Sequence, residues 1–142
     1  MGEVVLKFGA DMQNCDLNPE QVAQLGEATL ENFGAFNDEK ALAQLKPLND
    51  FARANAITIS YAHFYLVFGA LNFPQLDDGR VMFAGITPAQ AAKLLNYSPA
   101  RIASGLMPMT EKGLVGRDIS GAYKVASVNL WFELANALTL SS

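Results

Sequence analysis

The stretch that decides the fold is residues 86–126, ITPAQAAKLLNYSPARIASGLMPMTEKGLVGRDISGAYKVA. Thr87-Pro88-Ala89-Gln90 combines a capping threonine, a proline at the first helical position and a glutamine suited to a capping box. It predicts a helix to about Leu95. Ser98-Pro99 predicts the start of a second helix, which would end near Gly113. Two short helices joined by a tight turn form a helix-turn-helix.

The residues after the second helix predict two short strands. Residues 114–117 and 122–126 flank the turn sequence Asp118-Ile119-Ser120-Gly121, a pattern typical of a β-hairpin. A hairpin in this position would form the wing of a winged helix-turn-helix. The two helices are expected to pack together through six apolar residues, Ala91, Ala92, Leu95, Ile102, Leu106 and Met109.

The segment SPARIASGLMPMTEKGLVGRD, residues 98–118, resembles a pattern of bacterial winged-helix regulators: a serine cap, a recognition helix, then E-K-G-L-V-x-R-D before the wing. The order of helical N-terminus, buried helix, winged helix and terminal helix is most similar to the MarR type. The resemblance is specific over residues 86–118 and architectural elsewhere. It implies a homodimer, held by the N- and C-terminal helices, that straddles double-stranded DNA at a pseudo-palindromic operator.

The resemblance also implies roles for individual residues. The helix from Pro99 would enter the major groove and expose Ala100, Arg101, Ser104 and Met107. Of these side chains, only that of Arg101 can make a bidentate contact with guanine. The residues expected to contact bases, phosphates or the DNA beside the wing are Thr87, Gln90, Lys93, Ser98, Arg101, Ser104, Arg117, Ser120 and Lys124.

Three features depart from the family pattern. Pro108 removes a helical hydrogen bond and predicts that the second helix kinks or ends near Met107. Gly105 is expected to loosen the same helix further. Arg101 is the one basic residue expected on the recognition face, so the attraction to phosphates would be weak. The alternative function is therefore a winged-helix adaptor or anti-regulator that binds a protein partner and has lost DNA binding.

The N-terminal part of the chain predicts an extended segment and helices. Residues 3–8 suit a short strand or an arm. Asn18-Pro19-Glu20-Gln21 predicts a helix start, because asparagine can cap and proline suits the first helical position. A further helical pattern begins at Asp38, and Pro47 predicts a break or kink within it.

Residues 57–72 are apolar on every side and predict a buried helix, capped near Thr58 or Ser60. A pair of strands is the alternative, because β-branched residues are frequent at the start of this segment. Val81-Met82-Phe83 is a candidate short strand. Near the C-terminus, a helical apolar stripe typical of a core or a dimer interface is formed by Val128, Trp131, Ala135 and Leu138.

The predicted fold is mainly α with a small β-hairpin wing: a winged helix-turn-helix flanked by N- and C-terminal dimerisation helices. The length of 142 residues fits a single domain. Within it, residues 1–56 would form the N-terminal arm and helices, residues 57–126 the winged helix-turn-helix, and residues 127–142 the C-terminal helix.

Composition excludes several classes of protein. The chain is 51% hydrophobic and 17% charged, which excludes a disordered chain. One cysteine and one histidine exclude a disulfide framework and most zinc hydrolases. The longest apolar run, residues 64–71, is too short to cross a membrane, and the N-terminus lacks a secretory pattern. We therefore expect a cytoplasmic protein without membrane contact, and the mean hydropathy of +0.15 suggests apolar surface buried in an oligomer.

The net charge of −4 is distributed unevenly. Residues 1–79 contain four basic and eleven acidic side chains, whereas residues 80–124 contain six basic and two acidic ones. A local basic patch attracts a polyanion even on an acidic chain, because salt screens charges beyond about 10 Å. The alternative is that six basic residues are an ordinary density for a segment of this length.

Two residue groups invite chemical roles. Cys15 precedes a helix, but Asp16 opposes a lowered thiol pKa, so an inert thiol is favoured over a redox sensor. Tyr61, His63 and Tyr65 are candidates for a pocket that binds a small aromatic or acidic effector, as the family resemblance implies. A hydrogen-bonded core histidine is the favoured interpretation of His63. Asp77-Asp78 suits a turn, and the sequence predicts no catalytic residue, metal site or cofactor.

Overall fold

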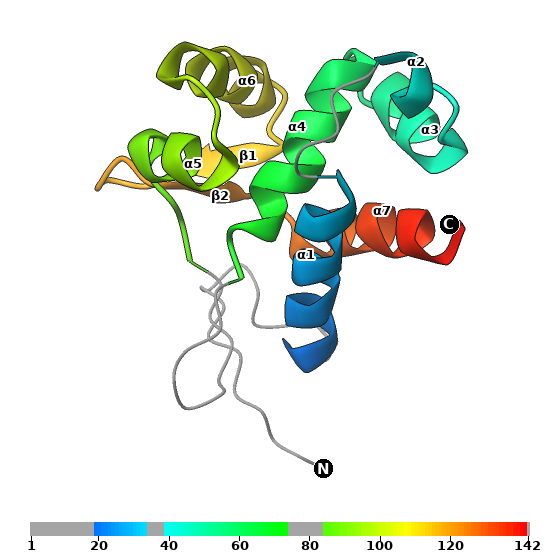
Figure 1. Ribbon diagram of the computed structural model, residues 1–142. Helices are drawn as coiled ribbons and strands as arrows, with labels where there is room; N and C mark the ends of the chain where they lie inside the picture. Colours follow the sequence, from blue (N-terminus) through cyan, green and yellow to red (C-terminus); the bar gives the residue numbers. More distant parts are fainter. Residues whose placement is uncertain (1–18, 34–38, 74–83, 142) are drawn as a thin grey trace.

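The computed structural model describes residues 19–33, 39–73 and 84–141, and this part of the chain is mainly helical with one small antiparallel hairpin (Figure 1). This observation confirms the coarse fold class that the sequence predicts. The elements in chain order are α1 (Pro19–Phe33), α2 (Glu39–Leu42), α3 (Lys46–Ala54), α4 (Ile59–Ala70), α5 (Pro88–Leu95), α6 (Pro99–Glu111), β1 (Val115–Arg117), β2 (Tyr123–Val125) and α7 (Val128–Ser141).

Helix α4 lies at the centre of the described structure (Figure 1). Thr58 caps its start, and the Thr58 hydroxyl oxygen accepts a hydrogen bond from the Tyr61 amide at 3.3 Å. Every residue from Ala62 to Ala70 is buried, because α1, α3, α6 and α7 all pack against this helix. The predicted buried helix is confirmed, and the alternative pair of strands is wrong.

The helical pattern that begins near Asp38 is divided into α2 and α3. Pro47 lies in the first turn of α3, where the amide hydrogen that proline lacks would have no helical acceptor. The predicted break near Pro47 is therefore confirmed. Phe51 of α3 then stacks on Tyr65 of α4, with ring centroids 4.9 Å apart.

Helix α7 approaches α4 closely through one aromatic side chain. Trp131 is fully buried, and its indole Nε1 donates a hydrogen bond to the Leu66 carbonyl oxygen at 2.9 Å. Gly69 makes room for the indole, since a Cβ atom at this position would clash with the Trp131 ring. The rest of the predicted stripe is buried as well, at Val128, Ala135 and Leu138, so the stripe forms part of the core of the chain.

Asn72, two residues after α4, joins this helix to the hairpin. Its buried side-chain amide donates hydrogen bonds to the carbonyl oxygens of Ala84 at 3.0 Å and Tyr123 at 3.2 Å. Its oxygen accepts from the Val125 amide at 3.0 Å. Ile86 also forms an antiparallel bridge with Tyr123, so the segment before α5 is fastened to β2.

Several predictions concern residues outside the described part: the arm at residues 3–8, Cys15, the cap at Asn18, the turn at Asp77-Asp78 and the strand Val81-Met82-Phe83. Within the described part, no helix has the length and apolar character needed to cross a membrane.

Candidate nucleic-acid interface

Helices α5 and α6 are joined by a turn that local sequence specifies. The Thr87 hydroxyl oxygen accepts from the Gln90 amide at 3.2 Å, and Gln90 Oε1 accepts from the Thr87 amide at 3.1 Å, which completes the predicted capping box. Asn96 ends α5 in the left-handed conformation with φ at 59°, which asparagine tolerates better than most residues. Ser98 caps α6 by accepting from the Arg101 amide at 3.1 Å. The predicted starts of both helices are confirmed.

The two faces of α6 differ sharply in exposure. The inner face buries Ile102, Gly105, Leu106 and Met109. The outer face exposes the four residues that the family resemblance implies for the recognition face, which are Ala100, Arg101, Ser104 and Met107. Helix α6 therefore has a continuous exposed surface that is supported from behind by apolar packing.

Helix α6 continues through Pro108 to Glu111, so the predicted end near Met107 is wrong, while a kink stays a prediction. The amide that Pro108 lacks would bond the carbonyl of Ser104, an exposed residue, so water can satisfy that oxygen. Burial of Leu106 and Met109 on either side of the proline holds the helix together.

Gly105 serves the packing of α6, which the sequence does not reveal. A Cβ atom at Gly105 would lie 2.8 Å from the Phe64 ring of α4. Glycine is expected to lower the intrinsic stability of α6. This close approach requires glycine nevertheless, because a Cβ atom would meet the Phe64 ring. Glycine therefore brings the exposed face of α6 to a fixed distance from the central helix.

Arg101 lies against the turn that precedes its own helix. Its guanidinium carbon is 3.8 Å from the centroid of the Tyr97 ring, within the range of a cation–π contact. Arg101 nevertheless stays exposed and keeps donors that can bond a base edge. Tyr97 is a residue that sequence reasoning missed, although the four-residue spacing to Arg101 could have indicated it.

The small polar residues differ in what they can still donate. Thr87 and Ser98 use their hydroxyl oxygens as acceptors, so each hydroxyl hydrogen can still bond a phosphate. The Ser104 hydroxyl instead donates to the Ala100 carbonyl at 3.0 Å, which leaves it only acceptor capacity. Ser104 is therefore suited to a base amine and unsuited to a phosphate oxygen.

The tip of the hairpin is held by Asp118. Asp118 Oδ1 accepts hydrogen bonds from the Ser120 hydroxyl at 2.6 Å, the Ser120 amide at 2.9 Å and the Ala122 amide at 3.1 Å. The Ser120 hydroxyl and these amides lower the pKa of Asp118, so the tip carries a negative charge. Ile119 beside it is fully exposed. Ser120 is present at the tip as expected, but its hydroxyl hydrogen already serves Asp118.

The positive charge lies on α5, on α6 and on the strands. Residues 84–126 contain five basic side chains against Glu111 and Asp118. In the hairpin, Arg117 of β1 is opposite Tyr123 of β2, and its guanidinium carbon is 5.9 Å from that ring centroid. The elements flanking α6 thus carry three basic residues of the expected contact set, which are Lys93, Arg117 and Lys124.

His63 is a hydrogen-bonded core histidine. Its Nε2 lies 2.7 Å from the Phe33 carbonyl oxygen, which can only accept, so Nε2 carries the proton. Burial lowers the pKa of His63, the bond to Phe33 opposes this effect, and the Arg101 charge lowers the pKa further.

Tyr65 is fully buried, and burial raises the pKa of its hydroxyl. Tyr61, His63 and Tyr65 do not line the pockets described next, and their role in effector binding stays a prediction.

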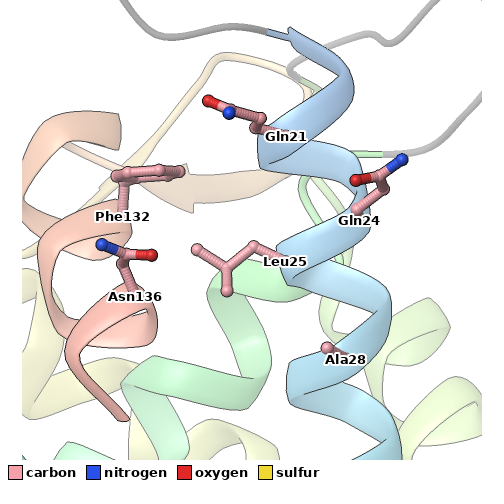
Figure 2. A pocket seen from close by; sticks show the side chains of 6 residues that line it. All are labelled: Gln21, Gln24, Leu25, Ala28, Phe132 and Asn136. Atoms are coloured by element: carbon pink, nitrogen blue, oxygen red, sulfur yellow. The ribbon is translucent and has the colours of Figure 1, made fainter. Parts of the chain in front are cut away.

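Two surface pockets are lined by residues of α1 and α7 in one case and of α5 in the other. One, of about 520 Å³, lies between α1 and α7, where Leu25 points toward Phe132 and Asn136 (Figure 2). The other, of about 370 Å³, includes Gln90 and Lys93 of α5 beside Leu71, at the end of α4, and residues 84–86, which precede α5. The first pocket marks a surface formed by the terminal helices of the described chain.

The described residues contain no group of three or more His, Cys, Asp or Glu side chains that could hold a metal ion. Comparisons with models of protein families, with curated proteins and with solved structures find no match.

Proposed function

We propose that this chain is a MarR-like winged helix-turn-helix protein that binds double-stranded DNA as a homodimer and regulates transcription. The observation that carries the proposal is the order of four elements: α5, a tight turn, α6 with an exposed outer face, and a hairpin. The Ile86–Tyr123 bridge ties the start of α5 to the hairpin, so these elements support one another. Such a unit can present one helix to the major groove.

The outer face of α6 supplies the base contacts in this proposal. Arg101 is in the first turn of α6, the part of a recognition helix that meets base edges. A bidentate contact from its guanidinium to guanine discriminates against the wrong base by about 1–3 kcal/mol. Ser104 and Met107 extend the same face and would meet neighbouring base edges.

The phosphate contacts come from elements on either side of α6. Lys93 on α5 and the hairpin residues Arg117 and Lys124 provide cations, and the capped N-termini of α5 and α6 provide amides and hydroxyls. Three cations in each of two protomers correspond to about six phosphate contacts, which predicts a steep dependence on salt.

The dimer in this proposal forms through α1 and α7. These helices lie on the other side of α4 from α5, α6 and the hairpin (Figure 1), so an interface there leaves the outer face of α6 free. The pocket between them contains apolar carbon from Leu25 and from Phe132, which is half-buried. Replacement of Phe132 by lysine is expected to reduce the mass measured by light scattering from dimer to monomer.

The direct test is fluorescence anisotropy with a labelled random-sequence duplex at about 50 and about 200 mM salt. With six phosphate contacts, the affinity is expected to fall about a thousandfold over this range. A fall of less than about tenfold, or no binding at the lower salt, would contradict DNA binding by this surface.

Matched variants separate the site from general charge. Lys93→Gln is expected to weaken binding to all sequences and to reduce the salt slope by about one unit for each contact removed. Lys46→Gln removes the same charge from α3, where Lys46 pairs with Asp50 at 2.7 Å, and is expected to leave DNA binding unchanged. Equal effects of the two variants would assign the attraction to net charge rather than to this interface.

A second candidate function is protein binding by the same surface. Met107 on the outer face of α6 is 64% exposed, and Leu94 on α5 is 65% exposed, and both are large apolar side chains. An adaptor that has lost DNA binding would use them to contact a partner. This function predicts no salt-dependent DNA retention, together with a captured protein that is released by Met107→Glu.

A further inference from the structure

Tyr97 is held firmly between α5 and α6. Its backbone amide donates to the Ala92 carbonyl oxygen at 2.9 Å, which wraps the chain around the end of α5. The next residue, Ser98, is fixed as the cap of α6. The Tyr97 ring is half-buried and packs against the apolar core. The ring is therefore a fixed surface beside the first turn of α6.

Arg101 lies on this surface although its position is electrostatically unfavourable. It is the third residue after the Ser98 cap, in the first turn, where the helix dipole disfavours a cation. Its guanidinium carbon is 3.8 Å from the Tyr97 centroid, and the electron-rich face of the ring compensates for part of this cost. A charge kept where the helix disfavours it, on the exposed face, indicates a functional demand.

We infer that Tyr97 is a positioning residue that orients the Arg101 guanidinium, and that this orientation sets the base preference of α6. This inference rests on the proposed DNA binding. A free arginine side chain would lose conformational entropy when it met a base, whereas one already resting on a ring loses less. Tyr97 thus increases discrimination between bases without touching DNA in its own right.

The first arm of the test examines the protein without DNA. Proton chemical shifts of the Arg101 side chain are compared in the unsubstituted protein, Tyr97→Phe and Tyr97→Leu. The ring current should move the Arg101 δ protons upfield in the first two proteins and not in Tyr97→Leu. Equal shifts in all three proteins would overturn the inference, because the guanidinium would then not rest on the ring in solution.

The second arm measures base preference. A randomised duplex library is enriched with the unsubstituted protein, and each G·C pair of the best duplex is then replaced by A·T. Arg101→Ala identifies the pair that Arg101 contacts, with an expected loss of discrimination of about 5- to 150-fold. Tyr97→Leu is expected to lose about two- to fivefold at the same pair, and Tyr97→Phe to keep the preference. The affinity of Tyr97→Leu for the unenriched library should equal that of the unsubstituted protein.

Two further variants keep the result interpretable. Arg101→Lys retains the charge on an exposed site but lacks the planar guanidinium, so it should lose the preference without loss of fold. The double variant Tyr97→Leu with Arg101→Ala should discriminate at this base pair as well as Arg101→Ala alone. A further loss of discrimination there would assign Tyr97 a separate role. DNA binding with base preference unchanged in Tyr97→Leu overturns this inference alone, whereas absence of DNA binding by the unsubstituted protein overturns the proposed function with it.

Discussion

Helices α4 and α6 have nearly the same length, 12 and 13 residues, but they meet their surroundings in opposite ways. In α4, nine consecutive residues from Ala62 to Ala70 are buried, so neighbours cover the helix on every side. In α6, one face is buried and the other is exposed from Ala100 to Met107. One helix therefore supports the fold, and the other presents a surface.

Glycine–aromatic contacts join α4 to α6 on one side and to α7 on the other. Gly69 of α4 accommodates Trp131 of α7, and Gly105 of α6 accommodates Phe64 of α4. Each contact sets the spacing between two helices. Substitutions at these contacts should therefore change stability by the largest amounts, while substitutions on the outer face of α6 should act mainly on binding.

The largest expected effect is at the contact between α4 and α7. Trp131→Ala removes a fully buried indole and its hydrogen bond to the Leu66 carbonyl. The free energy of unfolding is expected to fall by about 3–5 kcal/mol, measured by urea denaturation. Leu130→Ala removes a half-buried side chain from the same helix and should cost less than half as much. Equal losses would show that burial of Trp131 is not what joins α7 to α4.

A smaller loss is expected where α6 rests on α4. Gly105→Ala introduces a Cβ atom at 2.8 Å from the Phe64 ring, and overpacking of this kind costs about 1–3 kcal/mol. Alanine is the better helix former by about 1 kcal/mol, so an isolated helix would be stabilised by the same change. Thermal or urea unfolding decides the sign. Ser104→Ala on the exposed face is the control, and the double variant with Phe64→Leu should recover part of the loss.

The motifs that sequence could predict are those whose partners lie a few residues apart. Thr87 and Ser98 each cap a helix by bonding the amide three residues further on, so the pattern contains the whole interaction. The break at Pro47 depends on proline alone. For this reason the starts of α3, α5 and α6 follow from the sequence.

The features that sequence could not predict join distant segments. The Trp131–Leu66 hydrogen bond spans 65 residues, and the bond between Asn72 and the Val125 amide spans 53. In the sequence alone, Asn72 is an ordinary residue at the end of a helix, and its hydrogen bonds to the hairpin are not indicated. In the sequence alone, Gly105 predicts a less stable helix, and nothing indicates that the Phe64 ring lies opposite it. In each case one partner gives no indication of the other.

The smallest expected effect links α4 to α6 through pH. Burial lowers the pKa of His63 on α4 below the ordinary histidine value of 6.5, and the charge of Arg101 on α6 lowers it further. The unfolded chain therefore binds a proton more readily than the folded chain, and stability should be full above about pH 6.5 and decrease as the pH falls below that value. The loss cannot exceed about 1.4 kcal/mol per pH unit for one group.

Urea unfolding at several pH values between about 5 and 7.5 measures this loss against His63→Gln, which can still donate to the Phe33 carbonyl but does not titrate. The difference between the two proteins isolates His63, the one histidine of the chain. Arg101→Ala should raise the pKa of His63 and make the difference smaller, while Arg53→Ala on α3 should not. An unchanged difference in Arg101→Ala would mean that the charge on the outer face of α6 does not influence the interior of α4, and the two helices would then be coupled through apolar packing alone.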